Sequence, residues 1–108
     1  MSVLLVFTTV PDRGTADALA RDLVADGLAA CVNIQAPCTS MYHWEGKIET
    51  TAEIPLVAKT TEERYAALEA RLRAAHPYAV PEIVAIPVVG GLPAYLDWVT
   101  SSVANRPV

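Results

Sequence analysis

The order of apolar and polar positions along the chain predicts a mixture of strands and helices. Residues 3–8 form an apolar run without alternation, which is typical of a central strand covered on both faces. Apolar residues recur at helical spacing over residues 16–24 and again over residues 65–75, with charged residues between them. Residues 82–89 are rich in Ile and Val and favour another strand. Pro93 suits the first position of a short third helix.

The ends of these helices carry local signals. Thr15 can cap the first helix, and Gly27 can end it in the left-handed conformation that glycine tolerates. Thr60 and Glu63 have the spacing of a capping box at the start of the second helix. We expect residues 101–108 to form a frayed tail after the third helix.

The segment between the first two helices predicts one long hairpin. Residues 45–46 are Glu-Gly, and the glycine supplies the positive φ that a two-residue hairpin loop needs. This loop sets the pairing of the two strands. Trp44 then lies opposite Lys47, and Tyr42 lies opposite Glu49.

The predicted hairpin is longer than the body that carries it. Its return strand, residues 47–59, would span roughly 40 Å, whereas a compact domain of this length has a diameter of about 35 Å. Pro37 and Pro55 fall close together in the pairing and should interrupt the ladder. We therefore expect an inner half within the main sheet and an outer arm, residues 39–54, that projects.

The projecting arm has an apolar surface. A two-stranded ribbon is marginally stable alone, and its open edges invite pairing. We therefore expect the arm to be buried against another subunit. The predicted interface residues are Met41, Trp44, Ile48 and Trp98.

The order of elements is strand, helix, strand, strand, helix, strand and a short final helix. It predicts an α+β, ferredoxin-like fold, βαββαβ plus a C-terminal helix, over a single domain of residues 1–108. In that fold the helices lie on one sheet face, and the other face is open. The open face would be partly apolar here, because the first strand is apolar on both sides. Such a patch also favours self-association.

Composition and charge exclude several classes of protein. The chain is 53% hydrophobic with a net charge of −4. Its charges are interspersed without a basic cluster, so we expect no nucleic-acid partner. The longest uncharged stretch, residues 27–42, contains polar residues and is no membrane span. No basic start or cleavage site precedes the first strand, and we expect a cytoplasmic protein with Cys31 and Cys38 as buried free thiols.

The candidate site residues are few, and each has two interpretations. His76 is a possible metal ligand or a helix C-terminal cap. Lys59 and Glu82 lie at strand ends and would line a polar cleft near His76 or form a structural ion pair. Tyr42 and Tyr78 would form a wall of that cleft or part of an interface core. No nucleophile–base pair or Gly-rich phosphate loop is evident, so an enzyme is the least supported class.

Six segments, in this order and spacing, resemble the CutA (CutA1) proteins, a family associated with divalent cation tolerance. They are residues 23–34, residues 40–49, Lys59-Thr60-Thr61, His76-Pro77-Tyr78, Pro81-Glu82-Ile83 and Tyr95-Leu96-Asp97-Trp98.

The resemblance implies a ferredoxin-like subunit in a tight homotrimer of PII-like architecture, with clefts between subunits. It also implies binding of copper (Cu²⁺) or another divalent cation, no organic cofactor and no established catalytic activity. Copper ligation in some members uses a cysteine and paired histidines. The matching positions here are Thr8, Ala75 and His76. After His-Pro-Tyr, Ala79 stands where the family usually has an acidic or polar residue. We therefore expect either a trimer that binds a divalent cation or small anionic ligand, or a PII-like signalling scaffold that docks a partner protein.

Overall fold

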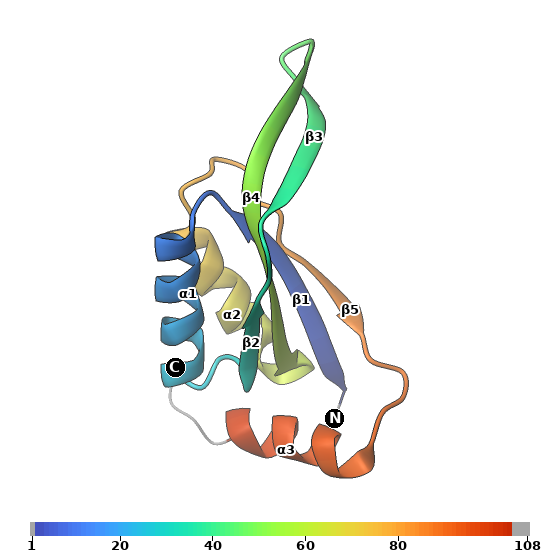
Figure 1. Ribbon diagram of the computed structural model, residues 1–108. Helices are drawn as coiled ribbons and strands as arrows, with labels where there is room; N and C mark the ends of the chain where they lie inside the picture. Colours follow the sequence, from blue (N-terminus) through green and yellow to red (C-terminus); the bar gives the residue numbers. More distant parts are fainter. Residues whose placement is uncertain (1, 105–108) are drawn as a thin grey trace.

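The structure, a computed structural model, describes residues 2–104 and has five strands and three helices within that range (Figure 1). In chain order they are β1 (Val3–Val10), α1 (Arg13–Ala25), β2 (Cys31–Ile34), β3 (Cys38–Trp44), β4 (Lys47–Thr61), α2 (Glu62–Ala75), β5 (Val84–Pro87) and α3 (Pro93–Val103).

The strands form one antiparallel sheet in the order β2-β4-β1-β5, and β3 pairs with the outer half of β4. Helices α1 and α2 lie together on one face of this sheet, whereas α3 crosses its end and contacts β1 and β4 (Figure 1). The predicted α+β, ferredoxin-like fold with an added C-terminal helix is confirmed. No helix within residues 2–104 is long and apolar enough to cross a membrane.

The core lies between the sheet and α1 and α2. Alternate residues of β1, such as Val6 and Val10, point into it because side chains along a strand alternate between faces. They pack with Leu23 of α1 and with Leu68 and Leu72 of α2, all of which are fully buried. Burying each such side chain stabilises the fold by about 2 kcal/mol.

The opposite face of the sheet is open in the single chain, as the ferredoxin-like fold predicted, although the apolar run of β1 by itself had indicated a strand covered on both faces. Phe7 lies between Val57 and Val84 in the strand register and is only partly buried. Leu5 lies next to Ile86, which is 48% exposed. The apolar run in β1 therefore reflects one face packed under helices and one face without helices.

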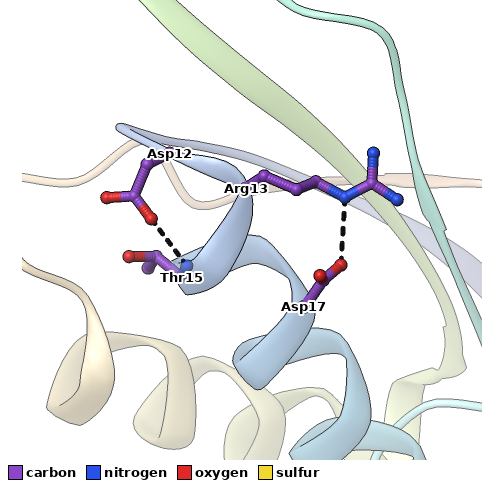
Figure 2. A network of polar contacts seen from close by, with 4 residues as sticks. All are labelled: Asp12, Arg13, Thr15 and Asp17. Atoms are coloured by element: carbon purple, nitrogen blue, oxygen red, sulfur yellow. Dashed lines mark hydrogen bonds and ion pairs between the residues drawn. The ribbon is translucent and has the colours of Figure 1, made fainter.

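Helix α1 begins earlier than its sequence signals indicated. Asp12, not Thr15, is the N-cap, and its carboxylate accepts a hydrogen bond of 2.8 Å from the Thr15 backbone N–H (Figure 2). That bond lowers the pKa of the Asp12 carboxyl. Arg13 and Asp17, one turn apart, form an exposed ion pair at 3.0 Å (Figure 2). Gly27, at φ 69°, follows the end of the helix as predicted.

Helix α2 lacks the predicted capping box. The helix begins at Glu62, and the N-cap Thr61 makes no side-chain capping bond. Thr60 is instead buried, and its hydroxyl donates a hydrogen bond of 2.7 Å to the Leu28 carbonyl. The tertiary contact has therefore replaced the local one.

The C-terminal third differs from the prediction in its boundaries. Strand β5 covers only Val84–Pro87 of the predicted 82–89. Helix α3 begins at Pro93 as expected but continues to Val103, so the start of the predicted tail is helical. Residues 105–108 of that predicted tail lie outside the described residues.

The hairpin register agrees with the prediction. Trp44 pairs with Lys47, and Tyr42 pairs with Glu49. Both loop residues have positive φ, 51° at residue 45 and 78° at residue 46, as a type I′ turn requires. The ladder is interrupted at residues 35–37, between β2 and β3, as the two prolines predicted.

The outer part of the hairpin projects from the body. We call β3 together with residues 47–53 of β4 the arm. It extends beyond the helices and the other strands (Figure 1). The molecule measures 45 × 27 × 22 Å, so it is much longer than it is wide. Met41, Trp44 and Ile48 on the arm are 69%, 55% and 66% exposed.

Candidate functional site

A group of polar side chains surrounds the point where the arm joins the body. Glu53, at the inner end of the arm, is only 8% exposed although it carries a carboxylate. Its Oε2 accepts a hydrogen bond of 2.8 Å from the Tyr78 hydroxyl and one of 3.3 Å from the Thr9 hydroxyl. We call Thr9, Glu53, His76 and Tyr78 the arm-root cluster.

The fold brings these residues together from three separate segments. Thr9 is near the end of β1 and pairs with Pro55, two residues after Glu53 on β4. His76 ends α2, because the residue before a proline avoids helical geometry. The chain then turns towards the arm, which places Tyr78 beside Glu53.

The electrostatics of the cluster favour an ionised carboxylate. Burial by itself raises the pKa of Glu53. Hydrogen bonds from Ser40, Tyr78 and Thr9 lower it, and so does the positive charge that His76 can carry. These effects outweigh burial, so the pKa of Glu53 lies below its usual value. Burial and the bond to Glu53 raise the pKa of Tyr78 to about 12. Tyr78 is therefore a stable hydrogen-bond donor and is unsuited to act as a base or nucleophile.

His76 is enclosed by its neighbours. The residue is 8% exposed, and its ring centroid lies 4.8 Å from that of Tyr78. Nε2 lies 2.8 Å from the Thr9 carbonyl oxygen, and Nδ1 lies 3.2 Å from the Tyr78 backbone nitrogen. Both ring nitrogens are therefore engaged within the chain.

Tyr42, another predicted site residue, lies on β3 of the arm. Its hydroxyl is 3.0 Å from the Thr51 hydroxyl on the neighbouring strand. Electrostatic interaction with Tyr42 also contributes to the raised pKa of Tyr78. His76 and Tyr78 thus belong to the arm-root cluster, and Tyr42 lies on the arm and interacts with Tyr78 electrostatically.

Lys59 is not brought to His76 within one chain. Lys59 pairs with Leu5, four residues along β1 from Thr9, or roughly 13 Å away. Its ammonium donates a hydrogen bond to the Asn33 side chain on the open sheet face and lies 4.0 Å from Cys31 Sγ. Glu82 is exposed in the segment before β5.

Sequence reasoning did not identify Glu53 as a site residue. Side chains alternate between the two faces of β4, and a glutamate in a strand ordinarily faces solvent, so Glu53 was not expected to be buried. The available signal was its position between Ala52 and Ile54-Pro55, where the predicted arm re-enters the body. A carboxylate at such a junction needs hydrogen-bond partners from neighbouring segments.

The predicted copper site does not fit the residues of one chain. Within residues 2–104, no three His, Cys, Asp or Glu side chains lie close enough to hold a metal ion. Thr8 offers a buried hydroxyl without a hydrogen-bond partner, where the soft metals prefer a thiolate. Ala75 offers no ligand atom, and both nitrogens of His76 are engaged. Cys31 and Cys38 are free thiols, each partly buried.

The predicted interface residues are exposed in the single chain. Met41, Trp44 and Ile48 lie on the arm, and Trp98 on α3 is 49% exposed beside the Tyr95 ring. Their burial between subunits stays a prediction.

Comparison with known proteins gives consistent results over almost the whole chain. The family model described as CutA1 divalent ion tolerance protein matches residues 4–102. The divalent-cation tolerance protein CutA of Thermus thermophilus is 46% identical over 94 residues, which cover 87% of this chain and 91% of that protein. The protein of the same name from Escherichia coli (strain HS) is 40% identical over 99 residues, 92% of this chain and 88% of that one.

Solved structures have the same fold. The crystal structure of CutA from Xylella fastidiosa superposes with a TM-score of 0.93 at 45% identity and covers 95% of this chain and 99% of that one. The family is named for tolerance of divalent cations and not for a reaction. The extent and identity of these matches show that this chain belongs to the CutA1 family of divalent ion tolerance proteins.

Proposed function

We propose that this chain forms a cytoplasmic homotrimer of PII-like architecture that binds copper, another divalent cation or a small anionic ligand at clefts between subunits. The supporting observation is the amount of apolar surface that the single chain leaves exposed. The arm and the open sheet face both lack a covering layer. Monomeric soluble proteins rarely expose such extended apolar patches.

The open sheet face supports assembly independently of the arm. Val84 and Ile86 of β5 are 50% and 48% exposed, and the side chains of Phe7 and Val57 continue this surface across the sheet. Burial of this surface against other subunits would supply the second layer that the fold lacks on this side.

A cation site in this protein would have to lie between subunits. No metal-ligand group of three forms within residues 2–104, so a cation site would need donors from more than one subunit. Each subunit would present an ionised carboxylate at the arm root and, for an anionic ligand, the Lys59 ammonium on the open face.

Sedimentation and calorimetry test the two parts of this proposal together. We expect a mass of three times the 11.5 kDa chain, and saturable heat when copper or zinc is titrated into metal-free protein. Val84→Asp should dissociate the assembly and abolish that heat, because it places a charge on the open face. Val24→Asp is the matched control, because Val24 is 42% exposed on α1, away from this face.

Either of two results would contradict the proposal. A folded wild-type species of 11.5 kDa at micromolar concentration would rule out the assembly. Undiminished cation binding by a monomeric Val84→Asp variant would rule out a site between subunits.

A PII-like signalling scaffold is the second candidate. Val89 is 99% exposed and Leu92 is 70% exposed, and both lie in the segment that joins β5 to α3. Such an apolar loop is typical of a docking surface for a partner protein. A stoichiometric partner recovered from native lysate by wild-type protein, and lost with Val89→Ser, would support this function over simple cation binding.

A further inference from the structure

The ring of His76 is held in one tautomer by partners that have fixed hydrogen-bonding roles. The Thr9 carbonyl oxygen only accepts, so Nε2 at 2.8 Å must carry the proton. The Tyr78 backbone nitrogen only donates, so Nδ1 at 3.2 Å must offer its lone pair. Of the two neutral tautomers, the surroundings therefore select the one with its proton on Nε2.

This tautomer leaves no nitrogen lone pair of His76 free to bind a metal ion. A histidine ligates through an unprotonated nitrogen. In His76 the only such nitrogen is Nδ1, and it faces the Tyr78 amide. The ring is also mostly buried, so ligation would require both bonds to break and the ring to leave its place.

The same two bonds connect His76 to the arm. The bond to the Tyr78 amide and the contact between the two rings fix where Tyr78 stands. The Tyr78 hydroxyl then donates to Glu53, at the inner end of the arm. A continuous series of contacts thus runs from β1 through the end of α2 to the arm root.

We propose that His76 is a positioning residue and not a metal ligand in this protein: it holds Tyr78 so that the Tyr78 hydroxyl fixes the Glu53 carboxylate at the root of the arm. The proposal concerns the free chain and holds whether or not the assembled protein binds a cation elsewhere. It gives the histidine of the His-Pro-Tyr segment a role that does not require a cysteine at position 8 or a histidine at position 75, where this chain has Thr8 and Ala75.

Nitrogen NMR of the histidine rings tests the first half of the proposal on unmodified protein. The chain has only two histidines, and His43→Ala assigns the spectrum because His43 is exposed on the arm. We expect His76 to show the Nε2–H tautomer at neutral pH in metal-free protein. Its nitrogen shifts should stay unchanged after one equivalent of zinc per subunit, even if His43 responds. A proton on Nδ1, or a zinc-induced shift of either His76 nitrogen, would overturn the proposal.

Carbon NMR titration of Glu53 tests the second half. His76→Ala should raise the Glu53 pKa towards its value in Tyr78→Phe, whereas His76→Asn should retain most of the wild-type behaviour, because its amide oxygen can accept the Tyr78 N–H bond. His43→Ala is the control and should leave Glu53 unchanged. If His76→Ala titrates like wild type while Tyr78→Phe does not, His76 does not act through Tyr78. Should His76→Ala fail to fold, the ring measurement on wild type still decides between positioning and ligation.

Discussion

At the scale of single residues, the main feature is a carboxylate that is mostly buried and still ionised. Glu53 is tolerated there because three hydroxyl groups can donate to it, from Ser40, Thr9 and Tyr78. A buried carboxylate without such donors would become neutral. The stability of the arm root therefore depends on hydroxyl donors that lie far apart in the sequence.

Tyr78→Phe is expected to destabilise the protein by about 1.5 kcal/mol, because it removes a hydrogen bond to a charged and mostly buried acceptor. Urea unfolding at neutral pH and fixed protein concentration measures the difference. Tyr95→Phe is the matched control, because the Tyr95 side chain is 41% exposed on α3. Equal stabilities for the two variants would show that the Glu53 bond contributes nothing.

The lowered pKa of Glu53 predicts a specific sensitivity to acid. Because folding lowers this pKa, the ionised group stabilises the fold above its ordinary pKa, and that stability is lost as the pH falls through the folded value. We expect wild type to be more stable than Glu53→Gln at pH 7 and to lose this advantage as the pH falls below the ordinary glutamate pKa of 4.5. A difference in unfolding free energy that stays constant over this range would contradict the assignment.

At the scale of elements, the sequence predicted best where one local interaction decides the structure. The glycine at residue 46 alone set the hairpin register, and Pro93 and Gly27 marked helix ends. It predicted poorly where a tertiary contact competes. Thr60 has good capping chemistry, but its hydroxyl bonds to Leu28. Glu53 and Tyr78 meet only after folding, so no local pattern connects them.

The arm turn should respond to substitution through its backbone alone. A Cβ at Gly46 would meet no neighbouring atom, but the positive φ of 78° is unfavourable for alanine by about 1 kcal/mol. Gly46→Ala should therefore increase local opening of the arm roughly fivefold, measured by amide hydrogen exchange over residues 38–53. Gly90→Ala is the control, because Gly90 also has free space but no positive φ.

Glu45→Asn should slow the same exchange, since Asn-Gly is the preferred sequence for this turn.

At the scale of the whole molecule, the two faces of the sheet differ in how completely they are covered. The helix side is complete, with Leu23, Leu68 and Leu72 fully buried. The open sheet face and the arm are incomplete, and the sequence indicated this through the apolar strand and the length of the hairpin. Which residues a second copy would bring to the arm root could not be predicted, because the arrangement of subunits is not encoded in the spacing of residues within one chain.

A charged residue on the arm distinguishes the folding of one subunit from the association of subunits. Ile48 is 66% exposed in the single chain, so Ile48→Lys should leave the fold of an isolated subunit intact. If neighbouring subunits bury this side chain, each copy loses about 2 kcal/mol of apolar burial and also buries an unpaired ammonium. We therefore expect the mass in sedimentation to fall from three chains towards 11.5 kDa, with the far-ultraviolet circular dichroism unchanged. Val24→Lys makes the same change on α1 and should keep the wild-type mass. An Ile48→Lys protein that also keeps it would show that this side of the arm stays in solvent, and the open sheet face alone would then have to hold the subunits together.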